Sequence, residues 1–185
     1  MEDLDVDLTA FNKNIDTMAP FEGARKLVQL CLTNDGQIHF QALRVLPLIA
    51  QRLGAHDLER VLSSGIYFNV IALPAVEIDL KRSLNPGNKL ITIEIISLKQ
   101  FETEEAAAII LHEIGHALDD RGGDRNTREI TADSFVIEKG LGPALLASLQ
   151  KAMRIWPDHI NLGVFESRIA NLRKQLKIPN SHGEE

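Results

Sequence analysis

Hydrophobic residues recur every three to four positions through the first third of the chain, which is the pattern of helices with one buried face. The spacing predicts one helix over residues 21–33 and a second over residues 38–53. Pro47 is expected to kink or restart the second helix, because proline lacks the backbone donor and clashes with the preceding turn. Gly54 should end it, and residues 57–63 should form a short third helix.

The pattern changes to that of β-strands in the middle of the chain. Residues 66–73 and 76–80 are rich in β-branched and aromatic side chains. Residues 90–96 alternate in part, with Thr92 and Glu94 on the face opposite three isoleucines. Together these segments predict a small, mainly antiparallel sheet.

Helical spacing returns in the remainder of the chain. Residues 102–139 predict two helices joined by a turn, the first capped by Thr103 and the second by Thr127. Residues 143–156 and 161–177 predict two more helices. The expected fold is therefore α+β, mostly helical, with the small sheet packed on the helix that begins near Thr103.

At 185 residues the chain is long enough for one domain with a substantial core. We divide this domain by composition and pattern. The expected parts are an acidic lead-in over residues 1–20, a helical part over 21–65, a core over 66–178 and a polar tail over 179–185.

Composition and charge narrow the classes of function. A formal net charge of −6 argues against a nucleic-acid-binding surface and favours basic or neutral substrates. Cys31 is the only cysteine, so no intrachain disulfide can form, which agrees with a reducing compartment. The chain begins without a basic, apolar leader, and no apolar run approaches the length of a membrane span. We therefore expect a cytoplasmic protein with a buried Cys31.

Residues that can bind a metal ion and act in catalysis lie together in the sequence His-Glu-x-x-His at residues 112–116. Residues four apart lie one above the other on a helix, so His112 and His116 can offer two imidazole nitrogens to one cation. Glu113 follows the first imidazole, where its carboxylate can hold a water bound to that cation. Zinc lowers the pKa of such a water to about 7 and polarises a carbonyl. The pattern predicts a Zn²⁺-dependent hydrolase.

A catalytic zinc site usually has three protein ligands and one open position. Glu129 is the expected third ligand. Asp133, one helical turn later, is expected to accept the second N–H of a liganding histidine and to fix its tautomer. The chain also offers other carboxylates as third ligands: Asp119, Asp120, Asp124 and Asp133.

His-Glu-Ile-Gly-His at 112–116 followed by Glu-x-x-Ala-Asp at 129–133 resembles the gluzincin metallopeptidases, and within them the M48 type. Segments 68–74, 156–159 and 166–169 are similar to other segments of that family. Two features depart from it: only residues 117–128 separate His116 from Glu129, and no membrane span is present. The same two motifs also resemble the soluble metallopeptidases that cleave phage-type repressors.

The resemblance implies a zincin-like fold and a zinc endopeptidase that acts on peptides or unfolded proteins, with Glu113 as general base. It also implies that the edge strand of the sheet takes the substrate as an added strand. A donor to the developing oxyanion is expected among four residues: His159, Tyr67, Arg125 and Arg168. The alternative is a catalytically weak or inactive zincin-like protein that binds a partner, as a component of a larger phage or virion assembly.

Overall fold

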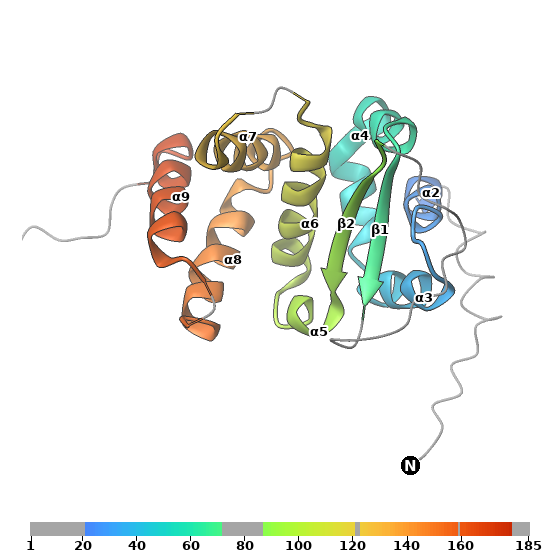
Figure 1. Cartoon of the computed structure of the whole chain (residues 1–185), viewed down its shortest axis with the longest axis horizontal. Coiled ribbons are helices and arrows are strands. Elements are labelled where there is room, and N and C mark those ends of the chain that lie inside the picture. The colour runs from blue at the N-terminus through green and yellow to red at the C-terminus, as the bar shows by residue number, and fades with distance from the viewer. Residues whose placement is uncertain (1–20, 72–86, 121–122, 159, 179–185) are drawn as a thin grey trace, which may run out of the picture.

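The computed structural model describes residues 21–71, 87–120, 123–158 and 160–178, and its elements are labelled in Figure 1. The helices and strands are, in chain order, α2 (Glu22–Val28), α3 (Asn34–Ala42), α4 (Leu46–Ser63), β1 (Ile66–Ile71), β2 (Lys89–Glu94), α5 (Ile95–Leu98), α6 (Thr103–Leu118), α7 (Arg125–Glu138), α8 (Gly142–Ile155) and α9 (Leu162–Gln175). The fold is α+β and mostly helical, as the sequence predicted. No helix in the described ranges is both long and apolar enough to cross a membrane.

The two strands pair in parallel, with Ile66 opposite Lys89 and Ile71 opposite Glu94. The expected antiparallel pairing was wrong. An antiparallel pair can be closed by a tight hairpin, whereas parallel strands need a connection of about a dozen residues or more. Residues 72–88 supply such a connection. The predicted strand at 76–80 lies outside the described residues.

The chain before α3 pairs with the other edge of β1. The Leu32 N–H donates to the carbonyl of Phe68 over 3.0 Å, and the Phe68 N–H donates to the carbonyl of Leu30, also over 3.0 Å. These bonds explain why α2 ends at Val28 rather than at residue 33. They also place β1 between two extended segments, whereas β2 has a neighbour on one side only within the described part of the chain.

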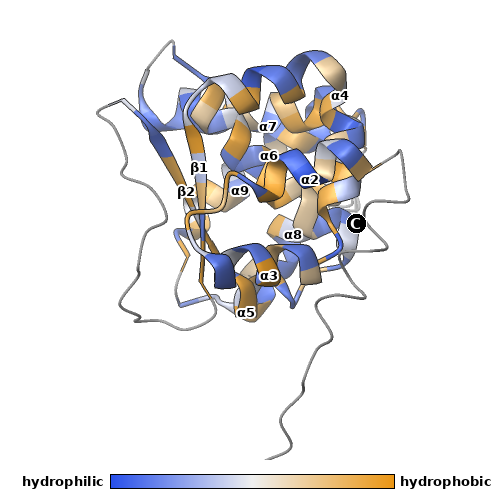
Figure 2. Cartoon of the chain, turned by 90° about the vertical axis from the view of Figure 1, so that its right-hand side faces the viewer, coloured by the Kyte–Doolittle hydropathy of each residue, from blue (hydrophilic) through white to orange (hydrophobic). Residues whose placement is uncertain are grey.

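Alternation along the strands decides which side chains enter the core. Ile91 and Ile93 of β2 are buried, whereas Thr92 and Glu94 are exposed, as the sequence predicted. β1 alternates in the same way. In Figure 2 the helices α2, α3 and α4 carry both hydrophilic and hydrophobic positions around their circumference, as expected for helices with one face on a core.

The predicted helix over residues 38–53 is divided between two helices. α3 ends at Ala42, Arg44 has a positive φ of 55°, and Pro47 lies in the first turn of α4. Proline is favoured there because the first amides of a helix have no partner within it. Gly54, with a φ of 66°, interrupts α4 where the sequence predicted an end.

Both helices that carry the acidic and histidine motifs begin earlier than predicted. Glu102, not Thr103, is the N-cap of α6, and its N–H donates to the Glu105 carboxylate over 3.0 Å in a capping box. Asp124, not Thr127, is the N-cap of α7. Its carboxylate accepts from the Thr127 N–H at 3.0 Å and from the Thr127 hydroxyl at 2.9 Å. In both cases the N-cap is a carboxylate that lies before the predicted threonine, by one residue in α6 and by three residues in α7.

α6 lies at the centre of the helical part and contacts α4, α7, α8 and β2 (Figure 1). Its first half is rich in alanine and long aliphatic residues, which favour the helix and pack closely. Apolar residues of α6 with less than a tenth of their surface exposed are Ala106, Ala107, Ala108, Ile110, Leu111, Ile114 and Ala117. This packing fixes the position of the histidines that follow.

An ion pair joins α4 to the end of α7. Lys139 pairs with Asp57, and both side chains are mostly buried, with 14% and 13% of their surface exposed. Asp57 also accepts from Arg60 at 3.1 Å. Burial raises the pKa of Asp57, but the hydrogen bonds from Lys139 and Arg60 lower it by more, so its pKa lies below the ordinary value of 3.8.

Replacement of Asp57 by Asn is expected to cost about 1–2 kcal/mol of unfolding free energy at neutral pH, between the values for exposed and buried pairs. Because the folded-state pKa is depressed, this contribution is present above pH 3.8 and is lost as the pH falls through the folded pKa. Urea unfolding from pH 7 to pH 3 checks this. Glu138→Gln is the matched control, because no described cation pairs with that exposed carboxylate. If the difference in unfolding free energy between the wild type and Asp57→Asn does not change with pH, the prediction is contradicted.

Candidate metal centre

The two histidines of α6 lie one turn apart on the side of the helix that faces α7. His112 is 5% exposed and His116 is partly buried. Their ring centroids are 4.5 Å apart, and the ring planes are inclined by 83°. The Nδ1 atom of His116 is buried and has no hydrogen-bond partner among the described residues. The helix therefore places two imidazoles side by side, both largely shielded from solvent.

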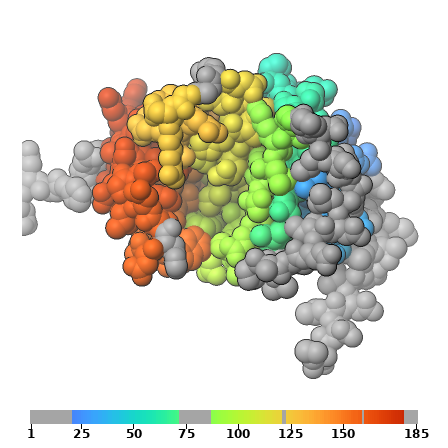
Figure 3. Space-filling model, in the orientation of Figure 1, coloured from blue at the N-terminus to red at the C-terminus, as the bar shows by residue number. Residues whose placement is uncertain are grey.

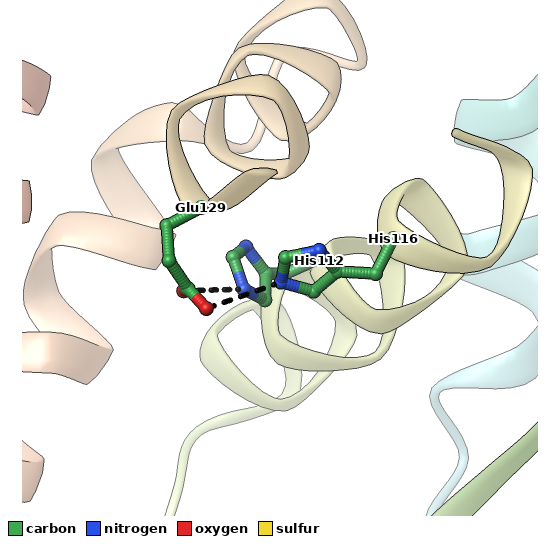
Figure 4. A group of neighbouring side chains, drawn as sticks. All are labelled: His112, His116 and Glu129. Carbon is green, nitrogen blue, oxygen red and sulfur yellow. Dashed lines mark ion pairs between the residues drawn. The ribbon is translucent and has the colours of Figure 1, made fainter. Parts of the chain in front are cut away.

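Glu129 of α7 points at both imidazoles (Figure 4). Its Oε2 atom lies 3.4 Å from His112 Nε2, and its Oε1 atom lies 3.5 Å from His116 Nε2. Two ligands of one tetrahedral zinc ion, each about 2.0–2.1 Å from the metal, lie about 3.3–3.4 Å apart. One donor atom from each of the three residues falls within 4.8 Å of the other two. The donor set and its spacing thus fit Zn²⁺.

Gly115 permits the close approach of α7 to α6. A Cβ atom at this position would lie 3.2 Å from the Ala132 Cα and 3.2 Å from the Phe135 Cδ1. The side chain of Ala132, which faces this contact, is fully buried. The glycine within the histidine motif and the alanine after Glu129 therefore set the distance between the helices that carry the three donors.

Asp133 holds one of the imidazoles in place. It is fully buried, and its Oδ1 atom lies 2.9 Å from His112 Nδ1. A hydrogen bond at Nδ1 leaves Nε2, the atom that faces Glu129, available as a metal ligand. The sequence predicted this placement of Asp133 from its position one turn after Glu129.

Arg168 of α9 contacts both acidic residues and the His112 ring. Its Nε atom donates to Asp133 Oδ2 over 3.1 Å, and an Nη atom donates to Asp133 Oδ1 over 2.6 Å. The other Nη atom lies 3.1 Å from Glu129 Oε2. The side chain is only 7% exposed. Arg168, predicted as an oxyanion donor, thus contacts the two carboxylates directly. No sequence spacing relates position 168 to them.

The charges of the site are strongly coupled. The His112 and His116 imidazoles hold the pKa of Glu129 well below its ordinary range. Burial lowers the pKa of His112, but hydrogen bonds with Asp133 and Glu129 raise it by more, so the net shift is upward. Burial raises the pKa of Asp133, yet hydrogen bonds with His112 and Arg168 outweigh it, and that pKa is lowered. The carboxylates therefore stay ionised and favour a proton or a metal cation at the imidazoles.

Glu113 differs from the other acidic residues of the site. It follows His112 on α6, it is exposed, and its side chain has no hydrogen bond or ion pair with another described residue. It lines a cleft that also contains His112 and Arg168. Its carboxylate is thus available to a water molecule or substrate next to the imidazoles.

The cleft has two arms that share His112, Glu113, Phe165 and Arg168. The apolar arm encloses about 370 Å³ and runs between β2, α5, α6, α8 and α9. Apolar side chains that line it include Ile93, Leu98, Phe101, Ile109, Leu149 and Trp156. The polar arm lies over the start of α7. In Figure 3 this face is hollowed over α6, between the green of β2 and the orange of α9.

The other predicted candidates lie away from the three donors or outside the described residues. Asp119 is the C-cap of α6, and Asp120 pairs with Lys89. Asp124 caps α7, and Tyr67 on β1 is not among the residues that line the cleft. His159 lies outside the described part of the chain. Of the predicted carboxylates, Glu129 is the one that the structure brings to both imidazoles.

Comparisons with protein-family models, curated proteins and solved structures found no match to this chain. Any functional assignment therefore rests on the geometry and chemistry of the site.

Proposed function

We propose that this protein is a zinc-dependent peptidase that hydrolyses peptide bonds within a polypeptide. One observation carries the proposal: His112, His116 and Glu129 meet at the spacing of zinc ligands, with the exposed Glu113 beside them in an open cleft. A purely structural zinc site is usually closed by four protein ligands. Among the residues that the structure describes three donors converge, which is the number found in catalytic sites.

The residues around the donors have separate tasks in this mechanism. Zinc held there would lower the pKa of a coordinated water to about 7 and polarise the scissile carbonyl. Glu113 takes the proton from the attacking water and delivers it to the leaving amine. Asp133 fixes the His112 tautomer, and Arg168 orients Asp133 and Glu129.

The apolar arm fits a peptide substrate in an extended conformation. Thr92, Ile93 and Glu94 of β2 line this arm beside Glu113. Among the described residues β2 has a paired strand on one side only, so a peptide can add to its other edge through backbone hydrogen bonds. A large apolar side chain of that peptide would occupy the space near Phe101 and Trp156. We propose peptides and unfolded proteins as the substrates.

Metal removal tests the proposal. Purified protein loaded with zinc is expected to contain about one zinc ion per chain and to cleave an unfolded protein substrate such as reduced casein, because the three donors form one site. A chelator should abolish cleavage, and added Zn²⁺ should restore it. Mass spectrometry of the metal and of the fragments provides the measurement on one sample.

A His116→Ala variant serves as the matched control for contaminating proteases. It should lose both the zinc and the cleavage, because its side chain supplies one of three donors. Cleavage that survives in this variant would contradict the proposal. Zinc bound without any turnover in the wild type would instead favour the alternative, a zincin-like binding protein within a larger assembly.

A further inference from the structure

Two arginines line the polar arm of the cleft. Arg125 and Arg128 lie three residues apart on α7, and they border the arm together with Gly123 and Val164. Both arginines are exposed, and within the described residues neither side chain has an ion pair or a hydrogen-bond partner. The local charge thus differs from the net charge of −6 of the whole chain, which suggested basic or neutral substrates.

The other charged groups in and beside this arm mostly have ion pairs or hydrogen bonds with neighbouring residues. Arg168 binds Asp133 and Glu129, and Glu129 faces the two imidazoles. Asp124, next to Arg125, accepts two hydrogen bonds from Thr127. Two acids among the described residues line this arm, Glu113 and Glu129. Of these, only Glu113 has no ion pair. The residues that line this arm include three arginines and two glutamates, so its lining carries an excess of one positive charge.

The arginines lie within reach of a substrate bound at the metal centre. Arg125 precedes Glu129 by one helical turn, a rise of about 6 Å along the axis. An extended peptide advances about 3.3 Å per residue. The guanidinium groups can therefore meet a substrate group one to three residues from the bond at the metal.

We propose that Arg125 and Arg128 bind a carboxylate of the substrate and so make the protein selective for acidic peptides. The inference rests on the proposed function and names a substrate class for the same cleft. The planar guanidinium forms two parallel hydrogen bonds with a carboxylate, a charge-assisted contact stronger than one between neutral groups. The carboxylate is supplied either by an Asp or Glu side chain or by a free C-terminus.

Peptide pairs test the preference and separate the two sources. Each peptide has a central leucine. The two members of a pair differ only in having Asp or Asn at one position. Together the pairs cover the positions from three residues before the leucine to three residues after it. A further pair differs by a free or an amidated C-terminus. With zinc-loaded protein, kcat/KM for the acidic member is expected to be about tenfold higher at one position or for the free terminus, as one charge-assisted contact allows. The preference should weaken as salt is raised.

Variants assign the preference to the arginines. The Arg125→Gln/Arg128→Gln double variant is expected to lose it, so that the ratio of kcat/KM within the pair approaches one. Arg154→Gln is the matched control, because Arg154 is equally exposed but lies on α8 and does not line the cleft. This control should keep the full ratio.

Binding to zinc-loaded Glu113→Gln protein separates failure of this inference from failure of the proposed function. Fluorescence anisotropy with the same labelled peptides measures affinity without turnover. If acidic peptides bind more tightly, the arginine substitutions abolish that preference and the zinc-loaded wild type cleaves none of the peptides, the peptidase would be overturned and the carboxylate site supported. Cleavage or binding with no preference, or a preference that survives in the double variant, would overturn the carboxylate site.

Discussion

Glu113→Gln is expected to retain zinc and to lower turnover of an unfolded protein substrate by at least about 100-fold, the lower limit for loss of a general acid–base group. The amide has almost the size of the carboxylate but does not accept a proton at neutral pH. Glu113 is exposed and its side chain forms no hydrogen bond or ion pair with the three donors, so its replacement is expected to leave their arrangement intact. A stopped assay of fragment release, with zinc content measured on the same sample, gives both quantities.

Glu104→Gln is the matched control for this substitution, because Glu104 is an exposed residue of the same helix, in its first turn. It should retain both zinc and turnover. Unchanged cleavage by Glu113→Gln would exclude the proposed general base. Loss of zinc from Glu113→Gln would also contradict the structure, in which this carboxylate lies outside the donor set.

Gly115→Val is expected to weaken zinc binding at least tenfold and to lower the unfolding free energy by about 1–3 kcal/mol, as overpacking of a tight interface does. A Cβ atom alone would lie 3.2 Å from the Ala132 Cα, and the added methyl groups have no room beside Phe135. α7 must therefore move away from α6. Glu129 moves with it, and zinc tolerates ligand distances only within about 0.2 Å of the ideal value.

Two measurements separate the parts of this effect. Urea unfolding in the presence of chelator reports the packing cost, and titration against a competing zinc chelator reports the loss of affinity. Gly163→Val, on α9, is the matched control, because a Cβ there would have its nearest neighbour at 3.7 Å. Zinc affinity equal to that of the wild type in Gly115→Val would show that the contact between α6 and α7 does not set the position of Glu129.

Local chemistry made several parts of this molecule predictable. Apolar spacing located the helices, because a helix repeats every 3.6 residues whatever its neighbours. Alternation placed Ile91 and Ile93 in the core and Thr92 outside it. The four-residue spacing of His112 and His116 put both imidazoles on one side of α6, because that placement is a property of the helix itself.

Several predictions from the sequence failed, each for its own physical reason. The first helix stops at Val28 because residues 30–32 bond to β1. Thr103 and Thr127 are not N-caps, since Glu102 and Asp124 satisfy the free amides one residue and three residues earlier. Strand direction was wrong because alternation of side chains is the same in parallel and antiparallel pairs.

The sequence by itself determined the helical and extended segments, the pair of imidazoles on α6 and a short list of acidic residues that could join them. The tertiary structure decided which acid does so. It placed Glu129 against both rings, because Gly115 lets α7 approach α6, and it brought Arg168 into contact with Glu129 and Asp133. These contacts join residues whose separation along the chain follows no helical or strand period. They depend on how whole elements pack, which no local pattern of residues specifies.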